Sequence, residues 1–396
     1  MRRRTIRDLK PQELAGRRAL VRVDYNVPLG PAGAVADATR VEATLPTLRR
    51  LLEAGAKPVL LSHMGRPRGA VRPDLSLAPV APILEGLLET PVEFGGLPDS
   101  SEALERSRGG PGRVLLLENT RFLPGETRND DGLAARLAAL GDLFVSDAFG
   151  SAHRAHASVV GVTRHLRPAV AGLLVEAELE ALGALLAAPA TPFVVAFGGA
   201  KMSDKIRLLE RCLETADRVL IGGAMANTFL RARGVSMAAS VVEEEAVGLA
   251  GDLLARFGRR LRLPSDLVVA NPAEPGTERV VEGADVPDGM SALDIGPATA
   301  AAFAEIVRDA GTLFWNGPMG WFENETFAAG TRTLAQAAAD ATRRGAFTVI
   351  GGGDSASAVR GAGLMDAVSH VSTGGGAALE FLAQGTLPGL EALDEA

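Results

Sequence analysis

Six cationic side chains lie in loops after short apolar stretches in the first half of the chain, or at the start of the helical pattern that follows. Guanidinium groups bind phosphate and carboxylate oxygens through paired hydrogen bonds, so a group of them predicts a small ligand with several negative charges. Asp24 and Asn26, in one of these loops, would bond a hydroxyl group of that ligand. The alternative for any single arginine is a solvated surface position, because only four of the 41 basic residues are lysine. The six candidates are Arg40, His63, Arg66, Arg121, Arg154 and His156.

The second half of the chain carries glycine-rich loops of the kind that bind phosphate groups. They lie at residues 198–200, 222–224 and 351–353, each after an apolar stretch. Lys201 and Lys205 follow the first loop, and two compact ammonium charges so close together suit a phosphate chain. A single Gly-Gly turn is often only a tight packing contact. Three such loops with paired lysines favour a nucleotide site.

Polar residues beside these loops extend the expected nucleotide site. Ser203 or Asp204 would cap the helix after the first loop and leave its amino terminus to attract phosphate. Asp354 would bind Mg²⁺, which prefers one or two carboxylates together with phosphate oxygens. Asn316 and Glu323 close a later apolar stretch, and Glu323 would accept a ribose hydroxyl; the alternative for Glu323 is an exposed loop acid.

Other nucleotide-binding motifs are missing from the sequence. The chain lacks the pattern G-x-x-x-x-G-K-[ST], which excludes a P-loop enzyme, and has no well-placed G-x-G-x-x-G, which argues against a dinucleotide-dependent dehydrogenase. Cys212, the single cysteine, cannot form an internal disulfide, fits a reducing cytoplasm, and lies in a helical apolar pattern typical of a core residue.

The elements that would position these loops are short apolar strands separated by helix-length segments such as residues 39–54. Runs without strict alternation indicate parallel sheets covered on both faces, whose ligands lie beyond the carboxyl ends of the strands. We therefore expect the α/β class, with two doubly wound parallel-sheet (Rossmann-like) domains. The expected strands are 19–23, 58–61, 113–117, 143–145, 193–197, 218–221, 266–270, 312–315 and 347–350.

The length of 396 residues exceeds what one hydrophobic core usually supports, which favours two domains. Apolar residues within 171–190 have largely helical spacing and predict a hinge helix that joins the domains across a central cleft. We expect an N-terminal domain at 1–172 and a C-terminal domain at 173–384, with residues 385–396 packing back on the first.

Composition excludes several classes of protein. With 47% hydrophobic and 22% charged residues the chain is globular, and its net charge of −7 argues against a nucleic-acid partner. Residues 181–200 are uncharged, but Pro189 and Pro192 interrupt any helix that could span a membrane, so we expect no membrane partner. We also expect the protein to be soluble, cytoplasmic and monomeric.

Taken in order, several long motifs of the chain resemble the phosphoglycerate kinase family from near the first residue to the last. They are RVDYNVP (22–28), SHMGRPRG (62–69), ENTRF (118–122), SDAFGSAHRAHAS (146–158), GGAKMSDKI (198–206), WNGPMGWFE (315–323), GGGDSA (351–356) and STGGGAALE (372–380).

The resemblance implies a reversible, Mg²⁺-dependent transfer of a phosphoryl group between 1,3-bisphosphoglycerate with ADP and 3-phosphoglycerate with ATP. It implies that Lys201 and Arg40 stabilise the group in transfer, that Asp354 binds Mg²⁺ with the nucleotide phosphates, and that His156 has a supporting role. The implied phosphoglycerate-binding residues are Asp24, Tyr25, Asn26, Arg40, His63, Met64, Gly65, Arg66, Arg121 and Arg154. The implied nucleotide-binding residues are Gly199, Lys201, Lys205, Gly223, Ala292, Asn316, Glu323, Gly352, Gly353, Asp354 and Ser355.

The chain departs from the family pattern at a few positions. Ser355 stands where threonine is usual, Ala292 where a glycine near the adenine is usual, and Tyr25 where phenylalanine is common. Residues 237–244 lack the usual Gly-Lys. The sequence alone leaves open another α/β kinase, a non-catalytic nucleotide-binding regulator and an NAD-linked oxidoreductase.

Overall fold

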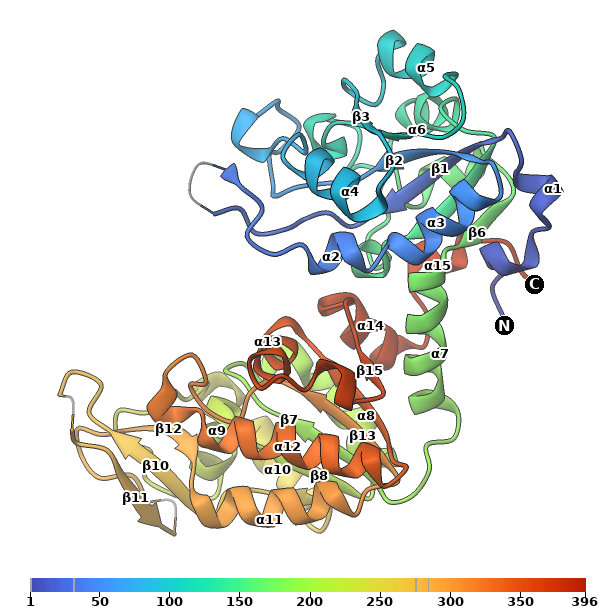
Figure 1. Ribbon diagram of the computed structural model, residues 1–396. Coiled ribbons are helices and arrows are strands. Elements are labelled where there is room, and N and C mark those ends of the chain that lie inside the picture. Colours follow the sequence, from blue (N-terminus) through green and yellow to red (C-terminus); the bar gives the residue numbers. More distant parts are fainter. Residues whose placement is uncertain (1, 31–32, 275, 284) are drawn as a thin grey trace. The chain divides into compact units, whose positions relative to one another are not determined.

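Parallel strands form the framework of the first part of the chain in the computed structural model, which describes residues 2–30, 33–274, 276–283 and 285–396 (Figure 1). These strands are β1 (Arg18–Val23), β2 (Lys57–Leu61), β3 (Val92–Phe94), β4 (Val114–Leu116), β5 (Leu143–Asp147) and β6 (Ala169–Ala171). Among the described residues they form one six-stranded sheet in the order β3-β4-β2-β1-β5-β6, and every neighbouring pair is parallel. The central strands β1, β2 and β5 are almost entirely buried, which shows that both faces of the sheet are covered.

Helices of the same part pack on this sheet through apolar side chains such as Leu48, Leu51 and Leu84, which are buried in one core with Val21 and Val145. The expected helical segment 39–54 is divided into two helices, with Pro46 in the first turn of the second, where proline fits best. The helices are α1 (Pro11–Leu14), α2 (Thr39–Glu42), α3 (Leu45–Glu53), α4 (Val80–Leu88), α5 (Ser101–Ser107) and α6 (Asp131–Ala138).

A second parallel sheet lies in the later part of the chain. Its strands are β7 (Phe193–Phe197), β8 (Arg218–Ile221), β9 (Leu261–Arg262), β13 (Thr312–Asn316), β14 (Phe347–Gly351) and β15 (His370–Val371). Over the residues that the structure describes, this sheet is six-stranded with the order β15-β14-β13-β7-β8-β9, again parallel throughout. The α/β class with two parallel sheets, expected from the sequence, is confirmed.

One strand expected in a parallel sheet belongs elsewhere. Residues 266–270 form β10 (Asp266–Ala270), which pairs antiparallel with β11 (Arg279–Glu282) and β12 (Ser291–Ile295) in a separate small sheet. The connection at residues 271–278 is shorter than the dozen or so residues that a parallel crossover needs, so β10 and β11 can only form a hairpin. Leu267 and Val269 of β10 are buried in one cluster with Leu230. The strand therefore has the apolar sequence of a core strand although it belongs to neither parallel sheet.

Helices also cover the second parallel sheet. Figure 1 shows two of them, residues 297–308 and 329–343, lying side by side, in agreement with their many mutual contacts. Cys212 is buried in the first helix after β7, as expected for a core residue, and burial raises the pKa of its thiol to about 12. The helices are α8 (Ile206–Thr215), α9 (Gly223–Ala232), α10 (Val247–Phe257), α11 (Pro297–Arg308), α12 (Ala329–Arg343), α13 (Gly353–Gly361) and α14 (Gly376–Gln384).

The chain divides into two compact units inside helix α7 (Leu173–Ala187). Unit 1 comprises residues 1–180 and 384–396, and unit 2 comprises residues 181–383. The end of the chain, which includes α15 (Pro388–Glu391), belongs to unit 1 because its backbone bonds there: Arg4 N donates to Asp394 O at 2.8 Å, and Gly389 N donates to Ala152 O at 2.8 Å.

Each parallel sheet has a point at which the order of its strands reverses. In unit 1 the chain moves from β1 to β2 in one direction and places β5 on the other side of β1. In unit 2 the reversal lies between β7 and β13. Ligands of doubly wound sheets bind beyond the carboxyl ends of the strands at such a point. The loops after β1, β5, β7 and β13 are therefore where a site is expected.

Candidate active site

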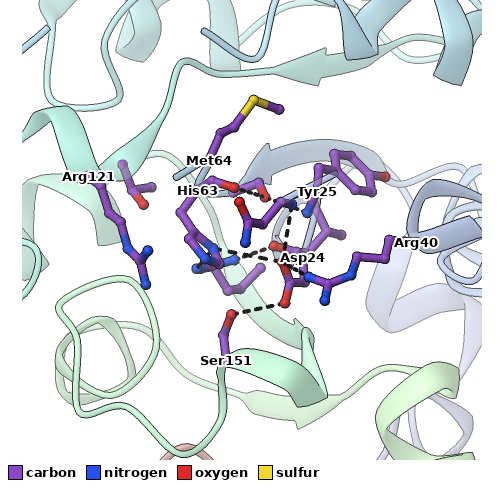
Figure 2. Close-up of polar contacts among 12 residues, drawn as sticks. Asp24, Tyr25, Arg40, His63, Met64, Arg121 and Ser151 are labelled. Carbon is purple, nitrogen blue, oxygen red and sulfur yellow. Dashed lines mark hydrogen bonds and ion pairs between the residues drawn. The ribbon is translucent and has the colours of Figure 1, made fainter. Parts of the chain in front are cut away.

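Asp24, directly after β1, is the centre of a polar group in unit 1. Its Oδ1 lies 3.1 Å from Arg40 Nη1 and 3.9 Å from His63 Nδ1, and Ser151 Oγ, from the loop after β5, donates to its Oδ2 at 3.5 Å. Figure 2 shows Arg40 and Arg121 on opposite sides of the Asp24 and His63 side chains. Burial alone would raise the pKa of the Asp24 carboxyl, but the neighbouring positive charges lower it below its ordinary value. Asp24 is therefore ionised and holds Arg40 in place.

Arg22, which sequence reasoning did not select, supports this group from inside β1. Its guanidinium is buried, donates from Nε to Ser158 Oγ at 2.9 Å and lies with Nη2 3.1 Å from His63 Nδ1. Because a guanidinium can only donate, Nδ1 of His63 accepts and the ring proton is on Nε2. Burial, and then the nearby guanidinium groups, hold the pKa of His63 well below its ordinary value, so His63 is neutral. The sequence did carry a signal for Arg22, because it is a charged residue within an otherwise apolar strand pattern.

Backbone contacts join the loops after β1, β2 and β4. Asn26 Oδ1 accepts from Gly65 N at 2.9 Å, and Arg121 Nη1 donates to Gly65 O at 2.6 Å. Met64 is buried, and its carbonyl accepts from Asn119 at 2.7 Å. The structure thus brings Asn26, Met64, Gly65 and Arg121 together.

Tyr25, the residue after Asp24, has its side chain in the core of unit 1. Its side chain is fully buried, and its hydroxyl lies 2.9 Å from Thr44 Oγ1 at the junction of α2 and α3. Its N–H donates to Ser62 Oγ at 2.8 Å. The ring therefore packs in the core, so no hydroxyl of Tyr25 reaches a ligand at this site.

The cationic residues of this group leave an excess of positive charge. Burial, followed by the charges of Arg154 and Arg22, lowers the pKa of Arg121 to about 10, and Arg121 Nε is buried without a hydrogen-bond partner. Burial and the same guanidinium groups lower the pKa of His156 to about 4, although Glu126 lies 3.7 Å from its Nδ1. An anionic ligand would relieve this repulsion.

Two of the predicted arginines lie at the edge of the group. Arg154 is half-buried and donates from Nε to His153 Nε2 at 3.0 Å. Arg66 follows Gly65 and is exposed to solvent, so its guanidinium is free to approach a bound anion.

Glycine loops after β7, β8 and β13 meet in unit 2. Gly198 N donates to Asn316 O and Gly199 N to Pro318 O, both at 2.9 Å. A Cβ on Gly198 would lie 2.0 Å from Pro318 O, and Gly223, at the start of α9, has a φ of +60° and no room for a side chain beside Gly199. Only glycine permits this close approach of three backbone segments.

A pocket of about 360 Å³ opens beside these loops, lined by five of the predicted nucleotide-binding residues: Gly199, Gly223, Ala292, Glu323 and Asp354. Its remaining lining is mostly apolar and includes residues that sequence reasoning did not select, among them Asn227, Val241, Asp294 and Trp321. Trp321 is 46% exposed and stacks on Phe327 with ring centroids 5.9 Å apart. A largely apolar pocket with a few polar groups suits a nucleotide base. These residues come from distant segments, so only the folded chain assembles them.

The two lysines of the first loop differ in their surroundings. Lys205 Nζ donates to Gly198 O at 2.9 Å, and burial lowers its pKa to about 8, although the charges of Asp354 and Asp204 oppose that shift. Lys201 is exposed. Lys205 is therefore fixed against the glycine loop, whereas the ammonium group of Lys201 is free to meet a ligand.

The loop after β14 completes the group. Gly352 precedes α13, which begins at Gly353, and Asp354 is exposed in its first turn. Ser355 is buried and accepts from Gly317 N at 2.6 Å, so its hydroxyl joins two loops. Asn316 donates to Gly351 O at 2.8 Å, and its Oδ1 is buried without a hydrogen-bond partner.

The expected cap of the helix after the first glycine loop is wrong. Helix α8 begins at Ile206, after a 3₁₀ turn at Ser203–Lys205, and neither Ser203 nor Asp204 caps it. Instead, Oε2 of Glu243 accepts from the N–H groups of Met202 at 2.7 Å and Ser203 at 3.1 Å. Sequence reasoning missed Glu243 because it lies about forty residues further along the chain.

A metal ion would have few protein ligands in this structure. Among the described residues, no group of three or more histidine, cysteine, aspartate or glutamate side chains is placed to hold one. The exposed carboxylate of Asp354 beside the pocket fits Mg²⁺ only if phosphate oxygens and water supply most of the other ligands, which is how Mg²⁺ is usually bound.

The fold and the two groups of residues are typical of an α/β phosphotransferase that acts on small anionic substrates. A family model described as phosphoglycerate kinase matches residues 6–385. The chain belongs to the phosphoglycerate kinase family, whose members are phosphotransferases with a carboxyl group as acceptor.

Individual relatives agree with this assignment over their full lengths. A phosphoglycerate kinase of Chloroflexus aggregans is 51% identical over all of both chains, and one of Thermus thermophilus is 54% identical over 99% of this chain and all of its own. Among solved structures, phosphoglycerate kinase from Coxiella burnetii matches with a TM-score of 0.86 and 39% identity over 98% of both chains. The enzyme from Pyrococcus horikoshii matches with a TM-score of 0.87 and 33% identity over 99% of this chain and 98% of its own.

Proposed function

We propose that unit 1 binds 3-phosphoglycerate or 1,3-bisphosphoglycerate and that unit 2 binds ATP or ADP together with Mg²⁺. The observation that carries the proposal is the excess of positive charge around Arg121, whose Nε is buried without a partner and whose pKa is lowered to about 10. A ligand with two or three negative charges would pair with this group. Asp24 and Asn26 would bond its hydroxyl, and Arg40, His63, Arg66, Arg121 and Arg154 would bind its acidic groups.

In unit 2 the proposed nucleotide lies with its base in the largely apolar pocket and its phosphates along the glycine loops. Glu323 would accept a ribose hydroxyl, and Lys205 would contact a phosphate from its fixed place beside Gly198. The other residues of this site would be Gly199, Gly223, Ala292, Asn316, Gly352, Gly353 and Ser355. Asp354 would hold Mg²⁺ with the phosphate oxygens, and the ion would neutralise part of their charge.

The proposed reaction needs no general base. The acceptor oxygen belongs to a carboxylate, which is already ionised at neutral pH, so the protein must only align the reactants and neutralise charge on the transferring group. Arg40 and Lys201 would supply that charge. The neutral states of His63 and His156 agree with binding roles, since both pKa values are lowered.

Because the two ligands bind to different units, transfer requires the units to approach each other. We propose that they close about α7 when both ligands are bound, which would also exclude water that could hydrolyse an acyl phosphate. Among the described residues, none of the helices has both the length and the apolar composition that spanning a lipid bilayer needs. We further propose a cytoplasmic, monomeric enzyme that acts in glycolysis without a nucleic-acid or membrane partner.

The proposal is tested by supplying the purified protein with ATP, Mg²⁺ and 3-phosphoglycerate and coupling the product to a dehydrogenase that consumes it. We expect saturable turnover that requires all three. Turnover with another small acid but not with 3-phosphoglycerate would contradict the substrate assignment, and nucleotide binding without any turnover would contradict catalysis.

Substitution Lys201→Ala tests the role proposed for the exposed lysine. An interaction made mainly in the transition state contributes to kcat and little to binding. We expect a loss of about a hundredfold or more in kcat, and a change of less than about threefold in the dissociation constant of ADP. Single-turnover kinetics and calorimetry measure the two quantities. Equal losses in both would contradict the role proposed for Lys201, and weaker ADP binding with an unchanged kcat would assign Lys201 to binding alone.

A further inference from the structure

The loop that carries Lys201 is held by a carboxylate outside the motifs that identified the site. Oε2 of Glu243 accepts from two successive backbone N–H groups, those of Met202 and Ser203, at 2.7 and 3.1 Å. These are the residues directly after Lys201. Hydrogen bonds from backbone N–H groups to an ionised carboxylate are stronger than neutral ones, so this contact restricts the loop.

Glu243 is itself fixed to helix α9. Its N–H donates to Thr228 Oγ1 at 3.1 Å, and Asn227 Nδ2 donates to Val241 O, also at 3.1 Å. Asn227 and Thr228 are both buried. Asn227 and Val241 also line the proposed nucleotide pocket. The segment between α9 and α10 thus joins the wall of the pocket to the Lys201 loop through one side chain.

The neighbouring acids do not share this role. Glu243, Glu244 and Glu245 are consecutive, but Glu244 and Glu245 are exposed in the 3₁₀ turn Glu244–Ala246. Burial would raise the pKa of Glu243, but hydrogen bonds from Ser203 and Met202 and the charge of Lys201 lower it overall. The Glu243 carboxyl group is therefore ionised at neutral pH, which strengthens its two N–H bonds.

We propose that Glu243 is a positioning residue for the phosphoryl transfer reaction, which holds the loop so that Lys201 meets the transferring group. The inference rests on the role proposed above for Lys201. The usual Gly-Lys is missing from residues 237–244 of this chain, yet the carboxylate contact is present.

The substitutions Glu243→Ala and Glu243→Gln test the contact. Alanine removes the acceptor, so we expect kcat to fall about tenfold to a hundredfold, the range that a displacement of about 1 Å costs, with the dissociation constant of ADP changed less than about threefold. Both bonds end on one oxygen, so the amide oxygen of glutamine can replace it, and Gln should retain most of the turnover. Glu245→Gln, which removes a nearby exposed charge, is the matched control and should leave kcat unchanged.

A double-mutant cycle separates positioning of Lys201 from a general structural effect. If Glu243 acts through Lys201, then Glu243→Ala causes no further loss of kcat in a Lys201→Ala protein. The same loss in both backgrounds, or an unchanged kcat in the single variant, would overturn the inference. If Lys201→Ala itself left kcat unchanged, the role proposed for Lys201 would be wrong. That result can be told apart from the two results that overturn the inference about Glu243.

Should Glu243→Ala fail to fold, Glu243→Asp takes its place in the cycle. The shorter side chain keeps the charge but moves the carboxylate away from the two N–H groups, so a loss of kcat is again expected. Full turnover in the aspartate variant would overturn the inference.

Discussion

Charge at single residues is set by burial as much as by residue type. Burial would raise the pKa of Asp24, but the charges of neighbouring side chains, Arg40 and Arg22 among them, lower it overall. His63, whose Nδ1 lies 3.9 Å from Asp24 Oδ1, is neutral because burial and the charge of Arg22 lower its pKa. The same competition makes Lys205 sensitive to pH, since burial lowers its pKa to about 8. Lys205 of unit 2 therefore loses its charge at a lower pH than Arg121 of unit 1, whose pKa is about 10.

Nucleotide affinity should depend on pH through Lys205. Below pH 8 its ammonium group is charged and binds phosphate; as pH rises through about 8 the charge is lost. We expect the dissociation constant of ADP, measured by calorimetry, to rise about tenfold between pH 7 and 9. In Lys205→Arg the guanidinium stays charged and the rise should disappear. A constant affinity of the unsubstituted protein over this range would contradict the assignment.

Residue types and their order along the chain were enough to predict most of the group around Asp24, because loops after parallel strands meet at one edge of a sheet. Arg22 and Glu243 escaped prediction for a different reason. Each acts through a partner distant in sequence, Ser158 and His63 for Arg22 and the Met202–Ser203 amides for Glu243. Contacts of that kind depend on the folded chain.

The amino terminus of α7 is held by buried polar groups of unit 1. Asp147 Oδ1 accepts from Leu174 N at 3.0 Å, and Thr47 Oγ1 accepts from Leu173 N at 2.8 Å. Burial raises the pKa of Asp147 to about 7, although hydrogen bonds from Thr47 and the helix oppose this shift. The helix that joins the two units therefore begins on a carboxyl group that titrates near neutral pH.

Asp147→Asn should change how stability depends on pH. The folded pKa of Asp147 lies above its unfolded value of 3.8, so between about pH 4 and 7 the folded state binds more protons than the unfolded state. The free energy of unfolding should fall by about 1.4 kcal/mol for each pH unit across that window because of this group, and Asn should remove that fall.

Urea unfolding followed by the near-ultraviolet signal of Tyr25, the only tyrosine and a residue of unit 1, measures this effect. The stability gained by the variant should increase from pH 5 to pH 8. Parallel pH profiles for the two proteins would contradict the account of Asp147.

Central strands were predicted to within a residue or two, because each is a buried apolar run bounded by turn residues; β7, β8 and β10 match their expected limits. Strands β11 and β12 of the small sheet were missed, and so were the edge strands β3, β6, β9 and β15 of the two parallel sheets. These edge strands have only two or three residues, and such short segments become strands only through a neighbour in the sheet. The prediction that β10 belongs to a parallel sheet was wrong for a related reason. The length of the connection to β11, and not the residues of β10 itself, determines which strands pair with β10.

The whole chain combines two units, each with its own parallel sheet and core, that are continuous through α7. The domain limits of 1–172 and 173–384 and the hinge remain predictions. Small-angle X-ray scattering tests the proposed closure: the radius of gyration should decrease when 3-phosphoglycerate and a non-hydrolysable ATP analogue are both bound. An unchanged radius with both ligands present would contradict closure about α7.

The central claim is that each unit binds one of the two substrates, and cross-titration tests it most directly. Calorimetry would measure the dissociation constants of 3-phosphoglycerate and ADP for the unsubstituted protein, Arg66→Ala and Lys205→Ala. Loss of a charged hydrogen bond predicts that Arg66→Ala weakens 3-phosphoglycerate binding about tenfold to a hundredfold and leaves ADP binding unchanged, with the reverse for Lys205→Ala. If either substitution weakened both ligands equally, or if each weakened the other's ligand, the division of the substrates between the two units would be wrong.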